Sequence, residues 1–245
     1  MNAFLKTPPK SEETTEEAAE KLIQEGVSGV GGFSLLFGRV GRAWVEGRGA
    51  AEKECRTGLA IVSNRSTDLH SVKWLCEERS ETHALSNSHY GDLSWPKVVQ
   101  AEQDVCEAVK LGVAKHESKE ALIQRFLEIL SRDSLPARKE DEEWDVYLGQ
   151  LRKSVFVHII GRKEQKEMDD LKKAIEATHG LTNGHADSPI VEATHGVYGT
   201  QKQTIILVDK EGRVTLFERT LFDADGRPVE RGEGDRTFEF QIEDW

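Results

Sequence analysis

Two short polar clusters contain the residue types that could take part in chemistry. Asn64 and Arg65 form one cluster, and Ser86, Asn87 and Ser88 form the other. Each cluster follows a short apolar run that is predicted to be a strand, and layered folds gather polar groups at strand ends. Amide and hydroxyl groups in such a place could stabilise an oxyanion or orient a bound ligand. The alternative is that these residues only form turns, for which Asn and Ser are well suited. They are therefore ligand-binding candidates, and no catalytic residue is assigned.

Three histidines occur close together in one Gly/Asn-rich stretch and could in principle bind a metal. They are His179, His185 and His195, within a predicted surface loop over residues 178–196. Two of them belong to repeated copies of Glu-Ala-Thr-His-Gly, and no cysteine accompanies them in a zinc-like spacing. We interpret them as loop histidines and expect neither a metal nor a cofactor.

Other common catalytic and cofactor motifs are missing from the sequence. The glycines at Gly29, Gly31 and Gly32 precede a predicted strand and not a helix, so they do not fit a dinucleotide-binding loop. No phosphate-binding loop and no Gly-x-Ser-x-Gly motif occurs. The three cysteines, Cys55, Cys76 and Cys106, are far apart along the chain, which favours free thiols in a reducing compartment.

The composition indicates an acidic globular protein. The chain has 245 residues, a net charge of −11 and 31% charged residues. An acidic surface repels the phosphate backbone, so we expect no nucleic-acid partner. No apolar run approaches the length of a membrane span, and the first residues have no apolar signal core. A cytoplasmic location is expected.

Hydrophobic periodicity predicts helices packed on antiparallel sheets, an α+β fold. A first helix is predicted after Ser11 as N-cap, ending at Gly26. Polar or glycine-rich segments predict surface loops at 39–57 and 132–146. The predicted strands are 33–38, 58–63, 72–76, 82–86, 154–160 and a three-stranded meander from Tyr198 to the end. The further predicted helices are 95–111, 118–130 and 161–177. The apolar face of the helix at 118–130 is predicted to consist of Ala121, Leu122, Phe126, Ile129 and Leu130.

Four segments carry a more specific pattern. They are GGFSLLFG (31–38), GLAIVSNR (58–65), HALSNSHYGDLSWPKV (83–98) and YGTQKQTIILVDKEGRVTLFERT (198–220). Together, and in this order along nearly the whole chain, they resemble the NRDE family, which is the family of transport and Golgi organization protein 2. The resemblance implies a single domain over residues 1–245 with an N-terminal-nucleophile-hydrolase-like αββα layered sandwich.

The resemblance also implies what the beginning of the chain lacks. Family members begin Met-Cys and carry Asn-Arg-Asp-Glu, whereas this chain begins Met1-Asn2 and contains no Asn-Arg-Asp-Glu. We therefore expect the domain to be N-terminally incomplete and only marginally stable. Without an N-terminal cysteine to act as nucleophile, we expect no amidohydrolase activity.

The function implied by the resemblance is non-enzymatic. It is a role in Golgi organization and protein secretion, through binding of haem or a lipid-like metabolite or of a secretory-pathway protein, with association to Golgi or mitochondria. The alternative is an N-terminal-nucleophile-type amidohydrolase whose Cys-bearing first segment is missing from this chain. An in-frame Met-Cys start upstream of Met1 would favour that alternative.

Overall fold

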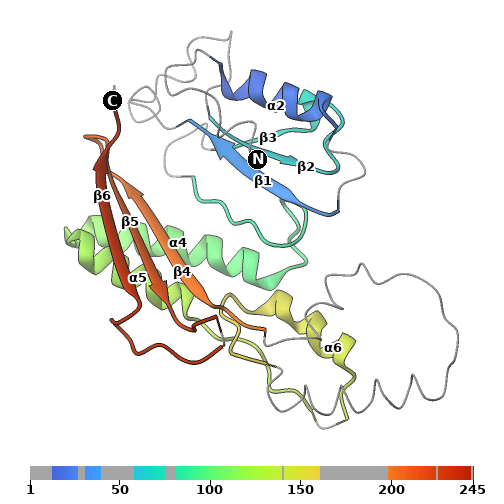
Figure 1. Cartoon of the computed structure of the whole chain (residues 1–245), viewed down its shortest axis with the longest axis vertical. Coiled ribbons are helices and arrows are strands. Elements are labelled where there is room, and N and C mark those ends of the chain that lie inside the picture. Colours follow the sequence, from blue (N-terminus) through green and yellow to red (C-terminus); the bar gives the residue numbers. More distant parts are fainter. Residues whose placement is uncertain are drawn as a thin grey trace, which may run out of the picture. The chain divides into compact units, whose positions relative to one another are not determined.

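The computed structural model confirms an α+β fold with two three-stranded sheets (Figure 1). The chain divides into two compact units, 1–114 with 208–214 and 240–245, and 115–207 with 215–239. That the chain forms a single domain stays a prediction. The structure describes residues 13–26, 31–39, 58–75, 81–139, 141–160, 198–224, 226–243 and 245.

Several sequence-based predictions lie outside the described residues. These include Ser11, the predicted helix 161–177, nearly all of the loop 39–57 and the whole of the loop 178–196 with its three histidines. Cys55, Cys76 and Gly29 also lie outside.

The first unit contains an antiparallel sheet in the order β1-β2-β3. Its strands are β1 (Ser34–Gly38), β2 (Leu59–Ser63) and β3 (Lys73–Leu75), and a short 3-10 helix η2 (Leu69–Ser71) precedes β3. Helix α2 (Thr15–Gln24) lies against one face of the sheet (Figure 1). The buried residues that join helix and sheet are Ala18, Ala19, Phe37, Ala60, Val62 and Val72.

Helix α2 begins three residues later than predicted. Its N-cap is Thr14, whose hydroxyl accepts a hydrogen bond from the Glu17 backbone N–H at 3.1 Å. The Glu17 carboxylate in turn accepts from the Thr14 N–H at 2.9 Å, which completes a capping box. Ser11 as N-cap is therefore wrong, because the Thr-x-x-Glu pair satisfies two free N–H groups. Gly26 follows the helix with a φ of +93°, as predicted.

The predicted strand at 82–86 is wrong. The described residues 81–86 contain no strand, and Ala84 donates its backbone N–H to the Glu102 carboxylate at 3.1 Å. Because the Glu102 side chain of helix α4 accepts this hydrogen bond, the Ala84 N–H does not need a partner on a neighbouring strand. Its alternation was too brief to distinguish a strand from an extended loop.

The predicted strand at 154–160 is also wrong, apart from one isolated bridge between Ile160 and Tyr198. Side chains and loop carbonyls satisfy its backbone instead. Val157 donates its N–H to the Thr200 hydroxyl at 2.9 Å, and Phe156 donates its N–H to the Arg132 carbonyl at 3.1 Å. The Ser154 hydroxyl accepts from the Ser134 N–H at 2.8 Å. Ser154 is only 1% exposed, so a buried hydroxyl holds this segment in an irregular path.

The helices agree better with the sequence. Pro96 opens α4 (Pro96–Lys115), and the Ser118 hydroxyl caps α5 (Lys119–Leu130) by accepting from the Ala121 N–H at 3.2 Å. The buried residues of α5 are Ile123, Leu127 and Ile129, and Phe126 and Leu130 pack against the same core. Ile129, Phe126 and Leu130 of the predicted face are therefore confirmed, and Ile123 and Leu127 were missed. The predicted loop 132–146 contains the start of α6 (Trp144–Leu148), which continues into the 3-10 helix η3 (Gly149–Lys153).

The predicted C-terminal meander is confirmed as a sheet in the order β4-β5-β6 (Figure 1). Its strands are β4 (Lys202–Val208), β5 (Arg213–Thr220) and β6 (Asp235–Gln241). Hydrogen bonds at both ends fix the β4–β5 register: Asp209 N to Arg213 O at 3.0 Å, and Leu221 N to Gln201 O at 2.8 Å. In this register Ile205 lies opposite Phe217.

The β5–β6 register is fixed in the same way. Thr220 N donates to Gly234 O at 3.0 Å, and Ile242 N donates to Gly212 O at 3.0 Å. Even-numbered residues of β6 therefore direct their backbone N–H and C=O groups towards β5, because these groups alternate along an antiparallel strand. The odd-numbered residues direct theirs away from β5.

The two faces of this sheet differ in what covers them. On the inner face, Ile205 and Phe217 pack with Ile123 and Leu127 of α5. The ion pair between Arg219 and Asp235, at 2.7 Å, lies on the same face and holds the pKa of Asp235 below its usual range. Side chains alternate between the two faces along each strand, so the even-numbered residues lie on the outer face. Its apolar residues are Ile206, Val208, Val214, Leu216, Phe238 and Phe240.

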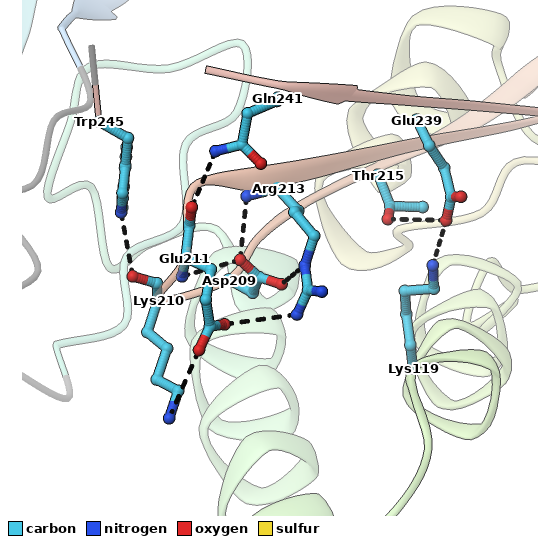
Figure 2. Close-up of polar contacts among 9 residues, drawn as sticks. All are labelled: Lys119, Asp209, Lys210, Glu211, Arg213, Thr215, Glu239, Gln241 and Trp245. Atoms are coloured by element: carbon cyan, nitrogen blue, oxygen red, sulfur yellow. Dashed lines mark hydrogen bonds and ion pairs between the residues drawn. The ribbon is translucent and has the colours of Figure 1, made fainter. Parts of the chain in front are cut away.

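The turn between β4 and β5 is closed by polar contacts and an indole ring (Figure 2). The Asp209 carboxylate accepts from the backbone N–H of Arg213 at 2.9 Å and from its guanidinium at 2.6 Å, and these contacts lower the pKa of Asp209. Gly212 has a φ of +79°. The Trp245 indole N–H donates to the Lys210 carbonyl at 3.0 Å.

Candidate functional site

The structure does not join the two polar clusters that the sequence singled out. Asn64 and Arg65 lie in the turn after β2, where the Arg65 N–H donates to the Ser63 hydroxyl at 3.2 Å. The cluster 86–88 lies in the loop before α4, and it does not end a strand. Among the described residues, no hydrogen bond or ion pair links one cluster to the other. A ligand-binding role for these residues stays a prediction.

A row of three titratable side chains crosses this same loop. The Tyr90 hydroxyl lies 2.8 Å from Nδ1 of His83, and Nε2 of His83 lies 3.0 Å from the Glu81 carboxylate. An ionised carboxylate can only accept, so Nε2 of His83 donates to Glu81, while Nδ1 lies within hydrogen-bond distance of the Tyr90 hydroxyl. The three side chains form one hydrogen-bonded row.

Helix α4 presents a second polar row to the same loop. Glu102, Cys106 and Lys110 are four residues apart, so they share one face of the helix. A hydrogen bond with Lys110, and a weaker one with Thr82, lower the pKa of the Cys106 thiol. Because Ala84 bonds to Glu102 while Thr82 bonds to Cys106, the loop runs along α4 and brings its polar groups to this row.

Sequence reasoning missed this arrangement, although one signal was available. The spacing Glu102-x-x-x-Cys106-x-x-x-Lys110 on a predicted helix was visible in the sequence and predicts one shared helix face. The Glu81–His83–Tyr90 row could not be predicted from the sequence, because it depends on the path of the loop. In chemical terms the helix offers a half-buried thiol with increased thiolate character.

Replacing Lys110 with methionine is expected to make the Cys106 thiol less reactive at neutral pH. The lysine lowers the thiol pKa, so its removal moves the alkylation-rate profile to higher pH. The measurement is the rate of iodoacetamide modification against pH, followed by mass spectrometry of the Cys106 peptide. Lys115→Met, on the same helix, is the matched control and should leave the profile unchanged. A profile equally unaffected by Lys110→Met would contradict this assignment.

The described residues offer no metal centre. Within them, no group of three or more His, Cys, Asp and Glu side chains is placed to hold a metal ion. None of the helices in the described part of the chain is both long and apolar enough to cross a membrane.

The outer face of the β4–β6 sheet is the second candidate site, and it is apolar. Ile206 is 60% exposed, Phe238 53% and Phe240 55%. Val208, beside them, is 39% exposed. Large apolar side chains gathered on one exposed face mark a binding surface more often than isolated ones do. We call Ile206, Val208, Phe238 and Phe240 the outer apolar face.

Comparison with known proteins agrees with the resemblance seen in the sequence. No curated protein matches the chain. The family model described as Transport and Golgi organisation 2 matches residues 1–223, which include the loop before α4, both long helices and strands β4 and β5. The match ends before β6. Because it covers most of the 245 residues, the chain belongs to the Transport and Golgi organisation 2 family, whose general role is in transport and Golgi organisation.

Proposed function

We propose that this protein acts in Golgi organisation and protein secretion as a binding protein for an apolar metabolite, either haem or a lipid-like molecule, without catalysing a reaction. The family supports the general role. The outer apolar face is the observation that supports the binding activity, because it exposes four large apolar side chains on one sheet face.

The register of the strands arranges this face in rows across the sheet. Six apolar side chains form two neighbouring rows, Ile206, Leu216 and Phe238 in one, and Val208, Val214 and Phe240 in the other. The next row contains Glu218 opposite the exposed Arg236. An apolar surface beside a guanidinium suits a ligand with an apolar body and an acidic group. Fatty acids and haem, with its propionates, share that chemistry.

Binding of such a ligand is expected to weaken when Ile206 is replaced by serine. Burial of a side chain of this size contributes about 1.5–3 kcal/mol, so affinity should fall about tenfold or more. Ile206 lies on β4, away from β6, and its side chain is 60% exposed, so the protein should remain folded. Two probes separate the ligand sources: haemin, followed by its Soret absorbance, and a fluorescent long-chain fatty acid, followed by displacement with palmitate.

The matched control is Val113→Ser, which removes another exposed apolar side chain, 71% exposed, from α4. It should bind the effective probe as the unchanged protein does. If neither probe binds saturably, or if Ile206→Ser binds as tightly as the unchanged protein, the proposal is wrong.

Each of the two antiparallel three-stranded sheets has a helix against one face. The N-terminal-nucleophile-hydrolase-like αββα sandwich that the resemblance implies would cover the outer apolar face with the second sheet, so the proposed ligand site does not rest on that finer fold. The amidohydrolase alternative has weaker support. Cys106 lies inside α4, where its nitrogen is a peptide nitrogen and cannot serve as the free amine base of such a nucleophile. We place the protein in the cytoplasm, associated with Golgi or mitochondria.

A further inference from the structure

Within the part of the chain that the structure describes, strand β6 forms an open edge of its sheet. In the order β4-β5-β6 it has one neighbour, β5, among the described strands. All of its residues after Asp235 are exposed. Its backbone groups at Asp235, Thr237, Glu239 and Gln241 point away from β5, as the register requires. Such a row of N–H and C=O groups is a template for another strand.

The sequence of β6 is complementary to itself when two copies run antiparallel. If Phe238 lies opposite Phe238 of a second copy, Arg236 lies opposite Phe240, a cation beside an aromatic ring. On the other face Thr237 lies opposite Glu239, and Asp235 lies opposite Gln241. Within β6, no two like charges lie opposite each other in this register.

Neighbouring registers are less favourable. A two-fold axis perpendicular to the sheet keeps both outer faces on the same side. The offset between the two strands can then change only by two residues at a time, which moves the central residue of the pair by one. Centring the pair on Thr237 places Asp235 opposite Glu239 of the second copy, and centring it on Glu239 places two copies of Glu239 together. Like charges directly opposite each other destabilise a strand pair. Charge therefore selects the register centred on Phe238.

The backbone agrees with the same register. The pairs Thr237–Glu239 and Asp235–Gln241 consist of odd-numbered residues, whose N–H and C=O groups point to the open edge. These residues can form the hydrogen-bonded pairs between the two copies. Phe238 then forms a non-hydrogen-bonded pair on the axis, with a Cα–Cα distance of about 4.5 Å, where side chains approach most closely.

We propose that two copies of this chain associate through β6, antiparallel and centred on Phe238, to form one continuous six-stranded sheet. A second copy is the occupant that this edge fits, because β6 supplies its own complementary sequence. The pairing also joins the outer apolar faces of the two copies, since the axis is perpendicular to the sheet. On the inner face, Glu239 keeps its contacts with Lys119 and Thr215 of its own chain (Figure 2).

The oligomeric state of the full chain tests the proposal. We expect a mass of two chains in light scattering after size exclusion, with dissociation on dilution. Thr237→Pro removes an N–H that points to the open edge and not to β5, which a proline at an edge tolerates. It should give a monomer with the circular dichroism spectrum of the unchanged protein. Thr237→Ala loses the same side chain but keeps the N–H, so it should remain a dimer.

Cysteine cross-linking tests the register. Phe238→Cys places two thiols opposite each other within disulfide reach, so mild oxidation should join the chains. Phe240→Cys is the control: its copies are offset by four residues, about 13 Å along the strand, and should not join. The unchanged protein measures the background from its three native cysteines. A monomer at every concentration overturns the proposal, and so does equal cross-linking at 238 and 240.

Discussion

Replacing Ile205 with alanine is expected to destabilise the protein by about 2–5 kcal/mol, the range for a large buried side chain cut to a methyl group. Ile205 is 6% exposed and packs with Phe217, Ile123 and Leu127. The change would leave a cavity between strand β4 and helix α5, where the surrounding side chains can collapse only partly. The free energy of unfolding, measured with urea, gives the effect directly.

The next residue along the chain is the matched control. Ile206 is the same residue type on the same strand, but it lies on the outer face and is 60% exposed. Ile206→Ala should change the unfolding free energy by no more than about 0.5 kcal/mol, as for other surface substitutions. Equal effects at the two positions would show that the faces of the sheet are assigned incorrectly.

The contrast between these two neighbours was partly predictable from sequence. The alternation of β4, with Gln203, Ile205 and Leu207 on one side, is the period-2 pattern that predicts a strand. The turn at Lys210 to Gly212 separates it from a second alternating run, so the meander could be predicted with its order. Which face α5 covers could not be predicted, because both faces carry large apolar residues.

The two wrong strands have a common physical cause. Both are short apolar runs whose backbone groups find partners far away in the sequence. Ala84 bonds to the side chain of Glu102, and Val157 bonds to the hydroxyl of Thr200. A local pattern contains no information about such partners. The same holds for the hydrogen-bonded row of Tyr90, His83 and Glu81, which depends on the path of a loop.

Helix ends depend on local chemistry, and they were predicted more closely. Ser118 caps α5 and Pro96 opens α4, as the sequence indicated. The start of α2 was misplaced because several polar residues compete for the N-cap. Only Thr14 has a glutamate three residues later that completes a capping box in the structure.

Gly212→Ala is expected to have the second large effect, because it strains the backbone and displaces an aromatic ring. Gly212 has a φ of +79°, which costs an alanine about 1–2 kcal/mol. A Cβ at this position would also lie 2.3 Å from Cγ of Trp245, within the ring that closes the turn (Figure 2). The ring would have to leave, and its hydrogen bond to the Lys210 carbonyl would be lost. Urea unfolding should show a loss of about 2–4 kcal/mol.

Two comparisons separate the steric effect from the backbone strain. Gly232 also has a positive φ, +99°, but no atom lies within 4 Å of where its Cβ would be. Gly232→Ala should therefore cost only the strain, about 1–2 kcal/mol. In a Trp245→Ala background the clash is absent, so Gly212→Ala should then cost about as much as Gly232→Ala. If Gly212→Ala costs the same with and without the ring, Trp245 does not pack on this turn in solution, and the C-terminal indole contributes nothing to its stability.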